Sequence, residues 1–194
     1  MKIFTSWLSW GQAAGPLAEA LPSHTVETLR EAVRFARRQH GVQQRPTGRP
    51  YAEHLLEALE VAVVGAEVRD RDVLTAIVLH DVLEDTPCTE QELRRRFGAD
   101  VTGLVKWVTR PAGGRKADHL AALAKAPPQA VLVKLADRVS NVQQLQRMPW
   151  RFQKRYFLET VAYILPLAEP YPWFAAWYEE WRRPWERRVA RYPG

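Results

Sequence analysis

The sequence predicts an all-α fold, a bundle of amphipathic and buried helices. Apolar residues return every three or four positions through most of the chain, which is the spacing of one helix face. Proline, glycine and capping residues separate these stretches, as they do between helices. No stretch is convincing as a β-strand. The chain has 194 residues, of which 46% are apolar, so one domain with a sizeable core is expected.

Capping residues, glycines and prolines set the expected helix boundaries. Ser23 or Thr25 caps the first long helix, Gly65 ends the second, and a capping box starts another near Glu90. Pro128 begins an apolar helix after a weak alanine-rich one. The predicted helices span residues 23–40, 51–64, 72–85, 90–97, 100–108, 118–126, 128–141, 151–167 and 173–185.

The chain divides into an N-terminal extension of residues 1–22, a main helical domain of residues 23–168, and a Trp- and Arg-rich helical tail of residues 169–194. The extension is expected to pack loosely or to cap the domain. The tail carries a tryptophan at every fourth position, which makes one stripe along a helix. This stripe either packs on the domain or offers a surface to a partner or a second copy. Its members are Trp173, Trp177, Trp181 and Trp185.

Composition excludes some classes of protein. No stretch of 18 or more apolar residues occurs, so a membrane-spanning helix is not expected. The one cysteine, Cys88, excludes an internal disulfide and fits the reducing cytoplasm, where we expect the protein to act.

The net charge of +6 would suit an anionic partner, either nucleic acid or a small polyphosphate. Because the positive charges are scattered, a solvated basic surface explains them equally well, and no nucleic-acid partner is expected.

The chemistry concentrates where the apolar run Leu74–Leu79 ends. Four ionisable residues follow within six positions, and their spacing in a helix places them on one side. Burying such a cluster alone is costly, and a cation would compensate it. Imidazole and carboxylate together suit Mn, Fe, Co or Zn. The simpler alternative is a buried histidine with solvated carboxylates at a helix end. The four residues are His80, Asp81, Glu84 and Asp85.

Further candidates lie on three other segments. His54 precedes the apolar side of its helix, and a lone histidine there is more often a core residue than a ligand. Asp137 ends an apolar helical run, with Asn141 on the same face; the alternative is an aspartate paired with a nearby arginine. Arg45 and Arg49 on a loop rich in proline and glycine could hold a phosphate, stack on a base, or be solvated.

These segments together resemble the HD-domain metal phosphohydrolases, and more closely the hydrolase domain of RelA/SpoT enzymes and the small alarmone hydrolases. Residues 44–54 resemble the family's arginine loop running into Tyr-x-x-His. Residues 79–86 match its His-Asp-x-x-Glu-Asp-Thr signature, and residues 133–141 match Lys-Leu-Ala-Asp-x-x-x-Asn. The resemblance extends roughly from Thr25 to Ala168 and implies an HD-domain helical bundle.

The resemblance also implies roles for individual residues. Glu84 and Asp85 would orient or activate the attacking water. The ligands of one divalent metal ion, most often Mn²⁺ in this family with other first-row metals open, would be His54, His80, Asp81 and Asp137. The substrate contacts would be Arg45 and Thr47 for the guanosine end, Asn141 for the ribose and Tyr156 in the pocket wall.

The implied reaction removes pyrophosphate from the 3′ position of (p)ppGpp, the alarmone of the stringent response, and leaves GDP or GTP. Three positions depart from the family: Pro46 replaces the usual Lys, Leu55 the usual Pro, and Gln144 a common Thr. Pro46 and Gln144 leave open another nucleotide substrate, such as NADPH, a 3′-phosphorylated nucleotide or a dNTP. A non-catalytic nucleotide-binding protein is the remaining alternative, and the complete His-Asp-Glu-Asp set counts against it.

Overall fold

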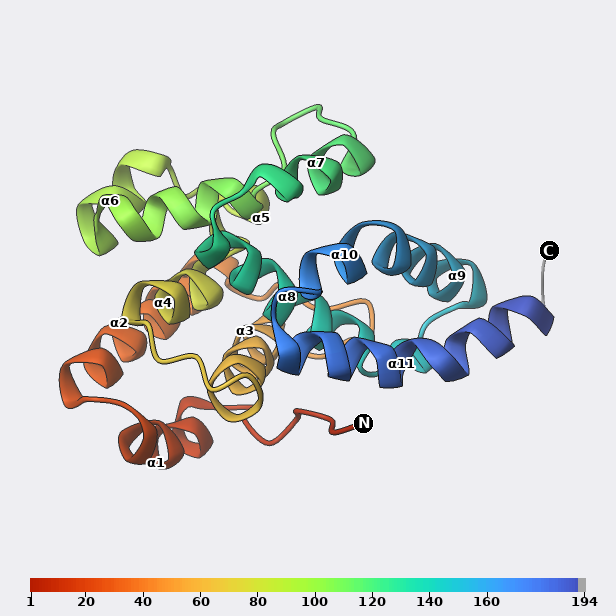
Figure 1. The fold of residues 1–194 in the computed structure, drawn as a ribbon. Coiled ribbons are helices and arrows are strands. Elements are labelled where there is room, and N and C mark those ends of the chain that lie inside the picture. The colour runs from red at the N-terminus through yellow and green to blue at the C-terminus, as the bar shows by residue number, and fades with distance from the viewer. Residues whose placement is uncertain (192–194) are drawn as a thin grey trace.

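The fold is all-α, as predicted, in a computed structural model that describes residues 1–191 (Figure 1). Within these residues no strand occurs, and the one β-type contact is an isolated bridge between Gln44 and Pro50. The α-helices are α1 (Trp10–Ala20), α2 (Ser23–His40), α3 (Tyr51–Glu60), α4 (Arg71–Leu79), α5 (Val82–Asp85), α6 (Glu90–Val108), α7 (Lys116–Ala122), α8 (Pro128–Val142), α9 (Trp150–Glu159), α10 (Leu165–Ala168) and α11 (Pro172–Arg191). Short π-helical turns η1 (Val61–Gly65) and η4 (Thr160–Ile164) and 3-10 turns η2 (Leu123–Lys125) and η3 (Leu145–Arg147) extend or join them.

Helices α4 and α8 form the centre of the bundle. Every residue of α4 from Val73 to Leu79 is buried, and this helix packs against α2, α3, α6 and α8. Figure 1 shows α8 in the middle of the molecule, with α2, α3 and α4 on one side and α9, α10 and α11 on the other. Continuous apolar runs in these two helices explain their place, because a helix that is apolar all round must be covered on all sides.

The central helix is shorter than its predicted range of residues 72–85. It ends at Leu79, and Val82–Asp85 form the separate short helix α5. The ring Nδ1 of His80 donates a hydrogen bond of 2.7 Å to the Ile77 carbonyl, which a continuing helix would offer to the Asp81 amide. The prediction that all four ionisable groups share one helix is therefore wrong, although all four remain at this turn.

The first residues of the chain pack tightly, so the expectation of loose packing was wrong. Phe4 and Trp7 are buried in the core. The Gln143 side chain exchanges two hydrogen bonds with the Phe4 backbone, of 2.7 and 2.8 Å. The buried Glu60 carboxylate accepts the backbone N–H groups of Ser6 and Trp7. The division of the chain at residue 22 stays a prediction.

The tryptophan stripe faces the domain. Trp177, Trp181 and Trp185 are buried, and the Trp181 indole donates a hydrogen bond of 3.1 Å to the Val142 carbonyl at the end of α8. The chain's own core covers these three residues, and Trp173 is partly buried. Formation of an oligomer through the stripe stays a prediction. The tail segment of residues 169–194 as a separate unit stays a prediction, and its residues 192–194 lie outside the described part of the chain.

No helix within residues 1–191 combines the length and the apolar character needed to cross a bilayer.

Replacing Gly65 with alanine is expected to lower the free energy of unfolding by about 1–3 kcal/mol, because overpacking forces neighbours to shift. A Cβ at this position would lie 2.4 Å from the Trp173 ring and 2.9 Å from the Phe4 ring. Thermal and urea denaturation measure the change. Gly15→Ala is the matched control, since nothing lies within 4 Å of its Cβ and alanine favours a helix interior. Equal stability of the two variants would contradict the tight contact.

Candidate metal centre and its cleft

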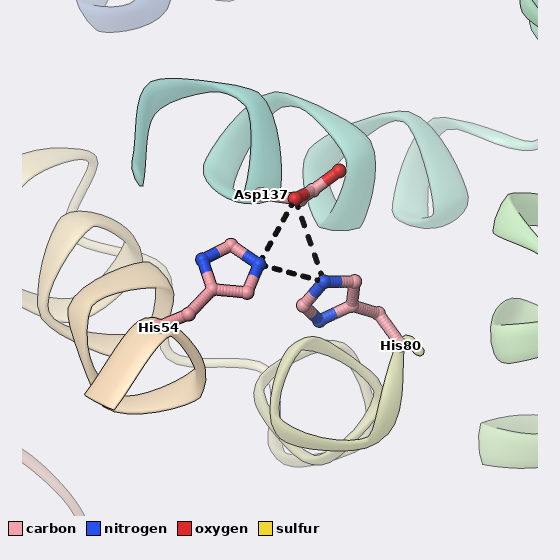
Figure 2. Close-up of side chains that lie close together, drawn as sticks. All are labelled: His54, His80 and Asp137. Atoms are coloured by element: carbon pink, nitrogen blue, oxygen red, sulfur yellow. Dashed lines mark hydrogen bonds and ion pairs between the residues drawn. The ribbon is translucent and has the colours of Figure 1, made fainter. Parts of the chain in front are cut away.

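Three helices bring two histidines and an aspartate to one point (Figure 2). His54 comes from the first turn of α3, His80 from the end of α4 and Asp137 from α8. The two histidine Nε2 atoms lie 3.2 Å apart, and Asp137 Oδ1 lies 3.2 Å from His54 Nε2 and 3.4 Å from His80 Nε2. All three side chains are buried, so the residues that were predicted on separate segments meet in a low-dielectric site.

Hydrogen bonds on the far side of each ring fix which nitrogen faces the cluster. His80 Nδ1 must carry a proton to donate to the Ile77 carbonyl. The Ser140 hydroxyl donates to the Glu57 carboxylate at 2.9 Å, so it accepts from His54 Nδ1 at 2.8 Å. In the neutral rings both Nε2 lone pairs then point at each other and at Asp137 Oδ1. The three lone pairs repel one another unless a cation lies between them. Two imidazole nitrogens and a carboxylate oxygen are ligands that fit a first-row divalent metal ion.

The charges around the cluster confirm that it favours a cation. Burial opposes a charge on His80, but Asp81 and Asp137 outweigh it and raise the pKa of His80 well above its ordinary value. For His54 burial prevails and lowers the pKa. Burial also works against the Asp137 carboxylate, but the Lys134 ammonium at 2.7 Å and His80 hold the pKa of Asp137 well below its usual range.

Asp81 lies beside the three converging atoms. Its Oδ2 is 2.8 Å from His80 Nε2 and 3.8 Å from His54 Nε2, and it accepts a hydrogen bond from the Tyr51 hydroxyl. Burial and the Asp81 charge raise the pKa of Tyr51, so this hydroxyl stays protonated and acts as a donor. Asp81 therefore contacts the cluster of His54, His80 and Asp137 at its edge, and its predicted role as a metal ligand stays a prediction. Tyr51 had no predicted role, although it stands three residues before His54 on the same helix face.

The predicted catalytic pair separates into two environments. Glu84 accepts three hydrogen bonds from Arg110, one from its backbone N–H at 2.8 Å and two from its guanidinium at 3.1 and 3.2 Å. Partial desolvation, followed by the charges of Asp81 and Glu84, raises the pKa of the Asp85 carboxyl. A carboxylate with a raised pKa is the better proton acceptor near neutral pH. Both side chains line the same cleft as the metal-binding cluster.

This cleft has a volume of about 330 Å³, and cations, an aromatic ring and an amide line it together with the acids. Lys116 and Arg138 stand 4.4 and 4.9 Å from the centre of the Tyr156 ring, and the partly buried Glu159 carboxylate pairs with both. Lys134 and Asn141 contact Asp137 directly. The cationic, aromatic and amide side chains of the lining include Arg45, Lys116, Lys134, Arg138, Asn141 and Tyr156.

The four residues predicted to contact the substrate differ in whether they line the cleft and in what they bond. Tyr156 lines the cleft as expected. Asn141 also lines it, but its amide donates to Asp137 Oδ1 at 2.5 Å. Arg45 reaches the cleft while its guanidinium is bound to Glu57. Thr47 lies exposed on the loop and does not line the cleft. The structure therefore joins three of the four predicted contacts to the site.

Two residues close to the cluster of His54, His80 and Asp137 were not predicted. Glu57 is buried on α3 and Ser140 is buried on α8, and Ser140 contacts both His54 and Glu57. One signal for Glu57 was present in the sequence, because an acidic residue inside the apolar stretch Leu55–Val63 requires a partner. Nothing in the sequence marks Ser140, because its partners lie more than 80 residues away.

The fold and the site together define a class of protein, the HD domain. The sequence profile of the HD domain family matches residues 32–171, and the chain belongs to that family. It is 39% identical over 125 residues to the guanosine-3′,5′-bis(diphosphate) 3′-pyrophosphohydrolase MESH1 of Homo sapiens, covering 61% of this chain and 70% of that protein. MESH1 of Drosophila melanogaster is 36% identical over 122 residues, covering 60% of this chain and 68% of that protein.

Longer relatives and a solved structure are also similar to this chain. The guanosine-3′,5′-bis(diphosphate) 3′-pyrophosphohydrolase of Aquifex aeolicus is 37% identical over 155 residues, or 76% of this chain. The chain spans only 22% of the length of that protein and of the bifunctional (p)ppGpp synthase/hydrolase SpoT of Escherichia coli. A solved structure described as a metazoan ortholog of SpoT that hydrolyzes ppGpp superposes with a TM-score of 0.74 and 28% identity. The superposition covers 81% of this chain and 94% of that one.

Proposed function

We propose that this chain is a metal-dependent hydrolase that removes pyrophosphate from the 3′ position of (p)ppGpp and leaves GDP or GTP, acting in the removal of the stringent-response alarmone. The convergence of His54, His80 and Asp137 on one point, beside a cleft that several lysines and arginines line, carries the proposal. It is supported by relatives named for this reaction, of which the chain covers 68 and 70%. The single cysteine, Cys88, fits a reducing compartment, and we place the reaction in the cytoplasm.

We propose that His54, His80 and Asp137 hold one divalent ion, with Asp81 as the fourth ligand. Mixed imidazole and carboxylate donors suit Mn²⁺, and other first-row metals remain compatible with them. A bound ion of this kind would lower the pKa of a water molecule to about 7 and would polarise a phosphoryl oxygen.

The chain's own side chains supply the remaining tasks in this proposal. Asp85, whose carboxyl has a raised pKa, accepts the proton of the attacking water, and Glu84 orients that water. Lys116 and Arg138, which line the cleft, neutralise phosphate charge. The Nη1 of the buried Arg138 guanidinium lies 3.6 Å from the Glu159 carboxylate, and its Nε has no hydrogen-bond partner within the described residues, which leaves one donor for an anion. We expect the Tyr156 ring, which lines the cleft, to contact a base or ribose.

A second candidate, hydrolysis of another nucleotide, is favoured by one observation. The two residues predicted to hold the guanosine end are not free in the cleft, because Arg45 is bound to Glu57 and Thr47 lies outside the lining. NADPH, a 3′-phosphorylated nucleotide and a dNTP are the substrates to compare. The same metal site would serve each of them.

The deciding experiment measures Mn²⁺-dependent release of pyrophosphate from ppGpp by the purified protein. NADPH, a 3′-phosphorylated nucleotide and a dNTP run in parallel, and chelation of the metal is the blank. We expect ppGpp to give the highest kcat/KM, with release lost on chelation. Faster release of phosphate from another nucleotide would reject the substrate while retaining the metal site. No turnover of any substrate by protein that binds Mn²⁺ would reject an enzymatic role.

Replacing Glu84 with glutamine is expected to lower kcat about 10²- to 10⁴-fold and to leave Mn²⁺ affinity within about twofold, because the side chain contributes a positioned charge and not a metal ligand. Steady-state kinetics and calorimetric Mn²⁺ titration measure the two quantities. Glu90→Gln is the matched control, an exposed glutamate that pairs with Lys106 at 3.0 Å far from the cleft. Unchanged kcat in Glu84→Gln would remove Glu84 from the mechanism.

A further inference from the structure

Glu57 is a buried carboxylate that several polar side chains contact. Its side chain is 1% exposed, on α3 one turn after His54. Removing a carboxylate from water costs several kcal/mol unless charges and hydrogen bonds compensate it. Arg45 Nη1 lies 2.7 Å from Glu57 Oε2, and Arg49 Nη1 lies 3.2 Å from Oε1. The loop of residues 44–50 therefore brings both arginines inward to Glu57.

The third partner of Glu57, Ser140, links it to the cluster of His54, His80 and Asp137. Ser140 on α8 donates its hydroxyl proton to Glu57 Oε2 at 2.9 Å. A hydroxyl has one proton, so the same oxygen accepts the hydrogen bond from His54 Nδ1 at 2.8 Å. Arg45, Glu57, Ser140 and His54 thus form a continuous hydrogen-bonded chain, and its last member presents Nε2 to Asp137.

We propose that Glu57, acting through Ser140, is a positioning residue that holds His54 with its Nε2 lone pair directed at the metal, and that Arg45 serves this relay by fixing Glu57. A hydroxyl that is already committed to a carboxylate can only accept from the imidazole, so the relay selects the Nδ1–H tautomer of His54 and fixes the plane of the ring. This inference rests on the metal-binding role of His54 in the proposed function.

The relay controls one of the two histidines. His80 takes its orientation from the Ile77 carbonyl, which no side-chain substitution removes. Loss of the relay therefore weakens metal binding without abolishing it. The same argument gives Arg45 a second role that can be tested by substitution. If Arg45 contacts only the substrate, its substitution changes KM and leaves metal affinity unchanged. If Arg45 belongs to the relay, its substitution changes metal affinity.

The first test is calorimetric titration of Mn²⁺ into metal-free Ser140→Ala and wild-type protein. We expect the variant to bind Mn²⁺ about 10- to 100-fold more weakly, the usual effect of losing a hydrogen-bond partner of a metal ligand. Thr102→Val is the matched control, because Thr102 is an equally buried hydroxyl that bonds the Gly98 carbonyl away from the site. Its Mn²⁺ affinity should equal that of wild type. Equal affinity of Ser140→Ala and wild type would overturn the relay.

The second test asks whether Glu57 acts through Ser140. Glu57→Gln should weaken Mn²⁺ binding in the wild-type background and should have no further effect in Ser140→Ala, because two members of one chain are not additive. Additive losses would overturn the assignment of Glu57. Should Glu57→Gln fail to fold, the Ser140→Ala titration and the Mn²⁺ affinity of Arg45→Gln decide alone. The readout needs no substrate, so failure to cleave ppGpp would reject the proposed function and leave this inference to be judged by the titrations.

Discussion

His80→Ala is expected to lower Mn²⁺-dependent turnover by about a thousandfold or more and to remove measurable high-affinity Mn²⁺ binding. The substitution deletes one of the three convergent donor atoms and leaves His54, Asp137 and the proposed fourth ligand Asp81 to hold the ion. Metal catalysis supplies several kcal/mol of transition-state stabilisation, and each 1.4 kcal/mol is a factor of ten in rate. Kinetics at saturating Mn²⁺ and calorimetric titration measure both effects.

His24→Ala is the control for this substitution, because His24 is exposed on the first turn of α2 and contributes to neither the cluster nor the cleft. Circular dichroism of both variants establishes that the helices are retained. A His80→Ala protein that binds Mn²⁺ within about twofold of wild type would show that the three converging atoms do not form the metal site.

Trp181→Ala is expected to lower the free energy of unfolding by about 3–5 kcal/mol, which corresponds to a fall in Tm of roughly 6–20 °C for a chain of this size. Trp181 is 1% exposed, packs beside Phe157 and Trp185, and donates to the Val142 carbonyl. Its removal leaves a large cavity and an unpaired carbonyl in the interior. Thermal and urea denaturation of the metal-free protein measure the loss.

Trp107→Ala provides the comparison, since Trp107 is 42% exposed on α6 and its truncation should change stability by well under the Trp181 effect. Equal losses in the two variants would show that α11 contributes little to the core. That result would support the tail of residues 169–194 as an independent segment.

Most helices were predictable because apolar spacing and capping residues are local signals. Gly98 illustrates this, since its φ of 88° interrupts α6 at the boundary that the sequence indicated. The break after Leu79 was not predictable from local signals. It depends on the His80 ring taking the Ile77 carbonyl while its other nitrogen faces His54, which is a requirement of tertiary structure.

The sequence predicted which residues would form the candidate metal site, but it could not predict how these residues are arranged in space. His54, His80 and Asp137 each end or begin an apolar stretch, where a polar group calls for an explanation. Their separation of 3.2–3.4 Å follows from the packing of α3, α4 and α8, which no spacing within one segment encodes. The packing of Phe4 and Trp7 was missed for the same reason, because their partners Gln143 and Glu60 lie far along the chain.

The hydrogen bonds between α11 and α8 have a consequence for the thermodynamics of metal binding. Tyr178 donates to the Leu135 carbonyl and Trp181 to the Val142 carbonyl, so α11 is attached to α8 on both sides of Asp137. A helix fixed at two points can neither slide nor rotate about its axis. The carboxylate is therefore preorganised, and an incoming ion meets a donor whose conformational entropy was already lost when the protein folded.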